Sequence, residues 1–215
     1  MKKLLWKEFA LAMHPTAIIF LSLSMMLIIP NYPYYVTFFY TGLAVFFTCL
    51  NGRENHDVAY TMSLPVRKRD IVKARFAFVM LMQLLQVLLA IPFAALRQSF
   101  DMPGNQVGMD ANIAFFGLSF GMLGLFNLVF FRVYYRDVNK VGTAFVWSST
   151  AIAVYMILAE VSAHAVPFVR DCLDTKDPEY LAYKLCVLAA GVLLYGLLTT
   201  VAYGNAVRSF EKLDL

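Results

Sequence analysis

The chain has 215 residues, of which 60% are hydrophobic and 15% are charged, whereas soluble globular chains average roughly 45–50% and about 25%. A soluble core of this length cannot bury so much apolar surface, so the composition excludes a soluble domain, a secreted disulfide scaffold, a disordered tail and a nucleic-acid binder. The net charge of +4 is small, and the placement of the charges is more informative than their sum.

Residues 1–14 are predicted to form an amphipathic helix that lies in the membrane interface. Leu5 and Phe9 follow helical spacing, while Lys3 and Lys7 lie one turn apart. Lysines in such a helix face anionic headgroups. The alternative is an ordinary charged flank of the first membrane span. The candidate interfacial residues are Lys3, Trp6, Lys7 and Phe9.

Six apolar stretches follow, and a helix needs about 17–25 apolar residues to cross a bilayer. The third to sixth stretches meet this length, the second is marginal, and the first is short and open to bending at His14-Pro15. We expect an all-α integral membrane protein whose residues 1–215 form a single transmembrane domain. The six predicted spans are residues 16–30, 34–50, 76–96, 112–131, 141–161 and 181–204.

The positions of lysine and arginine predict the orientation of these spans. If the N-terminus is cytoplasmic, 14 of the 18 basic residues fall in inner segments, as expected for cytoplasmic loops. Residues 51–75 then form a cytoplasmic loop with six basic residues, and residues 162–180 form an extracellular loop. The charges therefore predict six spans with both termini in the cytoplasm.

Motifs for catalysis or for binding of nucleotides and metals are absent from the sequence. It contains no GxxxxGKS or GxxxxGKT loop, no GxSxG elbow and no HExxH pair. We therefore predict no catalytic residue, no metal site and no cofactor in this chain. Glu160 and His164 stand four residues apart, and Asp171 or Asp174 could join them in a metal or proton site. The alternative is an interfacial glutamate beside a loop histidine.

Polar and small residues inside the spans predict helix packing. Gln83, Gln86 and Asn127 need hydrogen-bond partners in lipid, so they should face other helices or a substrate pathway. Gly117 and Gly121 form a small-xxx-small face. That face allows close packing against a helix of the same chain, or alternatively against a second chain.

The loop 51–75 is the most informative part of the sequence. Glu54–Met62 can form one or two helical turns, Ser63-Leu64-Pro65 ends them, and Asp70 can begin the next helix. A short amphipathic element in the cytosol suits docking into a groove of a partner protein. The alternative is a solvated basic loop that only sets the topology.

This loop resembles the first cytoplasmic loop of ABC-2 type permeases, the membrane subunits of bacterial ATP-binding-cassette exporters. The similar residues are Glu54, Ser63-Leu64-Pro65-Val66, Arg67, Arg69-Asp70-Ile71-Val72 and Lys73-Ala74-Arg75, together with Trp6-Lys7-Glu8-Phe9 ahead of His14-Pro15. The six-span plan is similar as well. Among these permeases, the chain most resembles the short exporters of phenol-soluble modulins and bacteriocins.

The resemblance implies several properties. A coupling helix in the loop would contact a separate ABC ATPase, which holds the ATP and Mg, and two permease chains, identical or different, would assemble in the bacterial cytoplasmic membrane. The coupling residues carried over are Glu54, Asn55, His56, Asp57, Val58, Ala59, Tyr60, Thr61, Met62, Arg67 and Arg69.

The expected function is export of amphipathic or hydrophobic cargo, with peptides favoured. The rival hypotheses are an ion-coupled carrier and a membrane immunity or assembly protein that transports nothing. The candidate residues of the translocation path are Phe38, Phe39, Tyr40, Phe46, Phe47, Phe115, Phe116, Asn127 and Tyr155.

Overall fold

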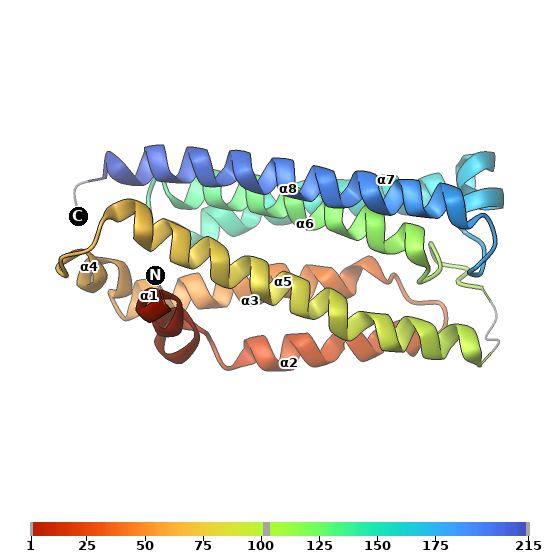
Figure 1. The fold of residues 1–215 in the computed structure, drawn as a ribbon, viewed down its shortest axis with the longest axis horizontal. Helices are drawn as coiled ribbons and strands as arrows, with labels where there is room; N and C mark the ends of the chain where they lie inside the picture. Colours follow the sequence, from red (N-terminus) through yellow and green to blue (C-terminus); the bar gives the residue numbers. More distant parts are fainter. Residues whose placement is uncertain (1, 101–103, 214–215) are drawn as a thin grey trace.

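The structure, a computed structural model, describes residues 2–100 and 104–213 as helices and connecting segments without strands. Five helices are long and apolar enough to cross a membrane, and they run side by side as a bundle (Figure 1). The chain is therefore an all-α integral membrane protein. The five helices are α3 (Tyr35–Glu54), α5 (Lys68–Ser99), α6 (Ile113–Tyr134), α7 (Val141–Ala165) and α8 (Leu181–Glu211).

The N-terminal segment is bent by 90° between its two halves. The first half comprises α1 (Lys2–Lys7) and the π-helix η1 (Glu8–Ala12), and the second comprises α2 (Thr16–Ser22) and the 3₁₀-helix η2 (Leu23–Ile28). In Figure 1, α1 lies across the bundle and α2 runs along it. The predicted span 16–30 is thus a short helix in two pieces, and Met1 lies outside the described residues. The break coincides with Pro15, which lacks the amide hydrogen needed to continue the helix.

The long helices extend beyond the apolar stretches that predicted them. The predicted span 76–96 lies within α5, and the predicted span 181–204 lies within α8. Backbone hydrogen bonding does not require apolar side chains, so a helix can continue past the end of its apolar stretch. Hydropathy therefore located apolar segments of these helices and underestimated the helix lengths.

The two predicted loops are correspondingly shorter than residues 51–75 and 162–180. Glu54 ends α3, so the predicted helix Glu54–Met62 is reduced to α4 (Asp57–Met62). The next helix begins at Lys68 and not at Asp70. At the other end, α7 continues to Ala165 and is followed by the π-helix η3 (Val169–Leu173).

Glycines let α6 and α8 lie closest together. Gly117 and Gly191 face each other so tightly that a Cβ on either residue would overlap the backbone of the other helix. Gly121 faces Leu194 of α8 and the hydroxyl of Tyr155 on α7. The small-residue face of α6 thus packs within the chain, as small residues do where helix backbones approach closely.

A hydrogen-bond network at mid-bundle joins α5, α6 and α8. The Gln83 and Asn127 amides donate to each other over 2.8 and 3.0 Å, and Asn127 Nδ2 also donates to Thr199 Oγ1. The Tyr195 hydroxyl donates to Gln83 Oε1 over 2.8 Å. Because polar groups in lipid need such partners, these amides serve to join the helices.

Both ends of the described chain lie at the same end of the bundle, together with α4 (Figure 1). We refer to it as the α4 end. The opposite end carries η3 and the connections from α5 to α6 and from α7 to α8.

Candidate functional site

The short helix α4 connects α3 to α5 and protrudes from the end of the bundle where both termini lie (Figure 1). It begins after His56, whose backbone is left-handed with φ of 50°, and this turn redirects the chain out of α3. Val58 and Met62 pack against the hydrophobic core, whereas Ala59 and Tyr60 are exposed, Tyr60 by 66%. An approaching partner would therefore contact Ala59 and Tyr60, while Val58 and Met62 hold α4 on the bundle.

Four charged side chains meet beneath α4. Arg75 lies 2.6 Å from Glu8 through Nε and 3.0 Å from Asp57 through Nη2. Lys7 Nζ lies 3.0 Å from Glu8 and 2.9 Å from Asp57. Glu8 and Arg75 are almost completely buried. We call Lys7, Glu8, Asp57 and Arg75 the charge cluster.

The charge cluster connects three segments that are far apart in sequence. Lys7 and Glu8 come from the N-terminal segment, Asp57 from α4 and Arg75 from α5. Each cation lies between two carboxylates, and this arrangement offsets the cost of removing the charges from water. The position of α4 is therefore tied to the N-terminal segment and to a membrane span.

Sequence reasoning missed Glu8 and Arg75 as site residues. The available signal was a carboxylate within the apolar face of the N-terminal helix, together with an arginine at the start of the apolar run Phe76–Leu96. Opposite charges at the borders of two apolar segments are suited to form an ion pair. Nothing in the local sequence, however, indicates that Glu8 and Arg75 pair with each other.

The other predicted coupling residues lie around α4 with differing contacts. Glu54 pairs with its neighbour Arg53, and Asn55 donates to Asn51 Oδ1. Thr61 is buried and accepts a hydrogen bond from Lys7. Arg67 precedes α5 and is exposed, and Arg69 donates to the Tyr203 hydroxyl on α8. Only part of this set is thus accessible to a partner.

The predicted interfacial residues divide between two faces. Lys3 and Trp6 are exposed, Trp6 by 72%. Lys7 belongs to the charge cluster, and Phe9 packs edge-on against Phe78 of α5 with ring centroids 4.9 Å apart. One face of the segment therefore anchors to the bundle and the other is free to contact headgroups.

The candidate path residues do not share one cavity. Phe38, Phe115 and Asn127 are fully buried in the packed interior. Tyr155 is hydrogen-bonded to the carbonyl of Leu118, and Phe116 lines a large groove. The remaining four form ring contacts among α2, α3 and α7: Phe39, Tyr40, Phe46 and Phe47.

The family comparison covers nearly the whole chain. Residues 3–211 match the model of a family described as ABC-2 family transporter protein. The chain belongs to the ABC-2 transporter family. It is thus a multi-pass permease, the membrane part of an ABC transporter. Comparison with curated proteins and with solved structures gave no match.

At the opposite end of the permease, the acidic residues are held by backbone groups. Glu160 Oε2 accepts a hydrogen bond from the Met109 amide over 2.9 Å, and Asp174 Oδ1 accepts one from the Asp110 amide over 2.7 Å. His164 Nε2 lies 3.4 Å from the carbonyl of Val107. Within residues 2–100 and 104–213, no three histidine, cysteine or acidic side chains are grouped to hold a metal.

Asp174 should make the stability of the permease depend on pH. Burial, reinforced by Asp110, raises the pKa of Asp174 to about 6, against the opposing effects of the Asp110 amide, His164 and Lys184; the unfolded value is about 3.9. Between these values the folded state binds more protons, so stability should fall as pH rises from about 4 to about 6. Asp174→Asn should remove this fall in pH-dependent unfolding measured in detergent.

The matched control is Asp171→Asn in the same loop. Asp171 is exposed, and its hydrogen bond to Arg170 lowers the pKa of Asp171. A carboxylate whose pKa is lowered by folding stabilises the folded state, and this stabilisation is lost as pH falls. Asp171 therefore contributes a pH dependence of stability opposite in sign to that of Asp174. The assignment to Asp174 is wrong if Asp174→Asn keeps the wild-type fall in stability between pH 4 and 6, or if Asp171→Asn removes that fall.

Proposed function

We propose that this permease is the membrane half of a bacterial exporter whose energy comes from a separate ABC ATPase docked against α4. The α4 end, with both termini, faces the cytoplasm, and ATP and Mg are bound by the ATPase. The observation that carries this proposal is the exposed α4, fixed to the bundle by the charge cluster.

The physical argument concerns the transmission of force. A docking helix on a flexible loop would move without moving the spans. Here Asp57 of α4 is ion-paired with Arg75 of α5, and Val58 and Met62 pack against the core. Displacement of α4 by a partner therefore displaces α5 and the N-terminal segment, which is the motion an exporter needs to change the packing of its spans.

The exposed faces of the bundle are consistent with a second permease chain and with apolar cargo. On α7 the side chains of Val154, Ile157 and Leu158 are each more than half exposed. In the bilayer this face contacts lipid or an identical or related permease chain. Cargo that is amphipathic or hydrophobic, such as a peptide helix, suits spans whose polar groups are already paired with one another.

Co-purification tests the docking assignment. The permease would be expressed with the ATPase encoded beside it, extracted in mild detergent and captured through its C-terminus. We expect the ATPase to be retained by the wild type and lost in Tyr60→Asp, because a charge then occupies the centre of the exposed docking face. Tyr60→Phe, which keeps the ring, should retain the ATPase.

The inward-facing residues give a second comparison. Val58→Asp combined with Met62→Asp places two charges against the core, so it should lower the thermal stability of the permease alone, whereas Tyr60→Asp should not. Retention of the ATPase by Tyr60→Asp would move the docking site away from α4. Absence of the ATPase from the wild type would argue against an ATPase-driven exporter.

A further inference from the structure

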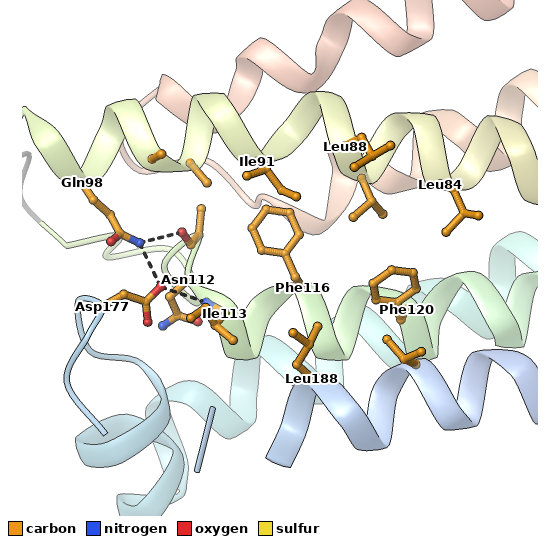
Figure 2. Close-up of a pocket in the computed structure, with 15 residues that line it drawn as sticks. Leu84, Leu88, Ile91, Gln98, Asn112, Ile113, Phe116, Phe120, Asp177 and Leu188 are labelled. Atoms are coloured by element: carbon orange, nitrogen blue, oxygen red, sulfur yellow. Dashed lines mark hydrogen bonds between the residues drawn. The ribbon is translucent and has the colours of Figure 1, made fainter. Parts of the chain in front are cut away.

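A large groove on the permease surface lies between α5, α6 and α8 and has a volume of about 570 Å³ (Figure 2). Among the described residues, its polar lining side chains are already hydrogen-bonded within the chain. Gln98 donates to the Asp177 carboxylate over 3.3 Å, and Lys184 donates to the same carboxylate over 2.9 Å. Asn112 donates to the Leu173 carbonyl over 2.7 Å. This part of the chain therefore offers an occupant of the groove no free charge that would determine its chemistry.

A second depression, with a volume of about 440 Å³, lies between α6 and α7 near the α4 end. Arg132 lies in the last turn of α6, and Arg136 lies in the turn that follows. Both arginine side chains are exposed. We call this feature the α6–α7 depression. The residues that line it are Leu128, Val129, Arg132, Val133, Arg136 and Trp147.

The free polar groups of the α6–α7 depression are all hydrogen-bond donors. Within residues 2–100 and 104–213, neither Arg132 nor Arg136 has a side-chain hydrogen bond or an ion pair, and no carboxylate lines the depression. The nearby Asp137 is paired with Lys140 over 3.3 Å. The indole nitrogen of Trp147 can only donate, and it too has no partner in the described part of the chain. A ligand of this depression must therefore supply acceptors and negative charge.

The position of the α6–α7 depression restricts that ligand to a lipid. Leu128 and Val129 belong to the candidate membrane span α6. From Leu128 to Arg132 the helix advances by about 6 Å, so the apolar wall continues from the cations toward the middle of the bilayer. Trp147 is 61% exposed on α7, and exposed tryptophans gather in the headgroup layer. A soluble anion would satisfy the arginines but not the wall, whereas a phospholipid carries both a phosphate and an acyl chain.

We propose that the α6–α7 depression binds one anionic phospholipid from the leaflet at the α4 end. Its phosphate lies between Arg132 and Arg136, and an acyl chain follows Leu128 and Val129. Each guanidinium can donate two parallel hydrogen bonds to phosphate oxygens, and basic pockets between membrane helices bind anionic headgroups. The bound lipid neutralises the two arginines and fixes the turn between α6 and α7 at the membrane border. This site is independent of the cargo and of the ATPase.

The first test is binding of single phospholipids to the full-length permease in mild detergent, measured by native mass spectrometry. The wild type should bind one phosphatidylglycerol more tightly than it binds zwitterionic phosphatidylcholine. Arg132→Gln combined with Arg136→Gln should lower the affinity for phosphatidylglycerol by about 30-fold, because two cationic contributions are lost. An excess of inorganic phosphate should not displace the lipid from the wild type, because phosphate alone makes no contact with the apolar wall.

The matched control is Arg67→Gln combined with Arg208→Gln. Both residues are exposed, and neither lines the α6–α7 depression. This control removes the same net charge from the same end of the bundle, so it separates a defined site from the overall positive charge. It should keep the wild-type affinity for phosphatidylglycerol.

The second test uses Trp147 itself as the probe. The Trp6→Phe variant carries Trp147 as its only tryptophan, and it would be reconstituted with phospholipids brominated in their acyl chains. Brominated phosphatidylglycerol should quench Trp147 at a lower fraction of total lipid than brominated phosphatidylcholine. Adding Arg132→Gln and Arg136→Gln should make the two quenching curves coincide, because the headgroup preference depends on the two arginines.

Three binding results would overturn the proposal. The first is equal binding of phosphatidylglycerol and phosphatidylcholine by the wild type. The second is an equal loss of phosphatidylglycerol binding in the two double variants, which would make the preference a property of net charge. The third is displacement of the lipid by inorganic phosphate, which would indicate an anion site that does not use the apolar wall.

Two further outcomes separate this proposal from other contacts. If Arg132→Gln with Arg136→Gln releases a second permease chain while the lipid preference persists, the arginines belong to a contact between chains, and the proposal is wrong. A permease that prefers phosphatidylglycerol at this site but binds no ATPase would support this proposal and contradict only the proposed function.

Discussion

Arg75→Met is expected to destabilise the permease by about 3–5 kcal/mol. Arg75 is buried and lies within 3.0 Å of both Glu8 and Asp57. Without it, two carboxylates share the single remaining cation, Lys7, and Glu8 stays 1% exposed. A buried charge that loses its partner carries its full desolvation cost. Reversible unfolding in detergent micelles measures the loss.

The control for Arg75 is Arg53→Met at the same end of the bundle. Arg53 pairs with Glu54 on the surface, and both side chains are at least 36% exposed. Such pairs contribute about 0–1 kcal/mol, so this variant should remain close to the wild type. Equal losses in the two arginine variants would mean that the charge cluster does not hold the α4 end together.

A double substitution separates the charge effect from a general loss of packing. Adding Glu8→Met to Arg75→Met leaves Lys7 and Asp57 as one balanced pair at 2.9 Å. Stability should then recover in part, because apolar side chains of similar volume can replace a buried ion pair without great loss. A double variant that is less stable than Arg75→Met would contradict this explanation.

Gly191→Ala is expected to destabilise the bundle by about 3 kcal/mol, at the upper end of the cost of overpacking. A Cβ at Gly191 would lie 1.9 Å from the carbonyl oxygen of Gly117. Conversely, a Cβ at Gly117 would lie 2.6 Å from the carbonyl oxygen of Val187. The obstructing atoms belong to backbone that cannot rotate away, so α6 and α8 must move apart. Unfolding in detergent again measures the effect.

Two other glycines provide a graded comparison. Gly196 lies on the same helix, and a Cβ added there would have no atom of the described residues within 4 Å, so Gly196→Ala should be neutral or stabilising by up to about 1 kcal/mol. Gly121→Ala should fall between the two, because the nearest atom, the Tyr155 hydroxyl at 3.0 Å, ends a side chain that can shift. A Gly191→Ala variant as stable as Gly196→Ala would show that α6 and α8 tolerate a wider separation.

Much of the fold could be predicted from the sequence because lipid imposes local rules. A span must be continuous and apolar, and basic residues stay on the cytoplasmic side. Five predicted spans therefore correspond to α3, α5, α6, α7 and α8. The Ser63-Leu64-Pro65 break was also local, since proline cannot continue a helix, and α4 indeed ends at Met62.

The loop pattern and the family were likewise encoded in local sequence. The segment around Glu54 and Arg67 resembles the first cytoplasmic loop of ABC-2 permeases, and residues 3–211 belong to that family. Which side of α4 faces outward was not predictable. Ala59 and Tyr60 are exposed while Val58 and Met62 pack against the core, because the left-handed turn at His56 sets the rotation of the helix.

The sequence by itself thus determined an all-helical membrane protein, most of its spans and its permease family. The tertiary structure alone decided the pairing of Glu8 with Arg75 and the contact between Gly117 and Gly191. The physical reason is the distance along the chain over which each interaction acts. Hydropathy and charge bias act on each segment separately, whereas a buried ion pair or a backbone contact depends on which distant helices pack together.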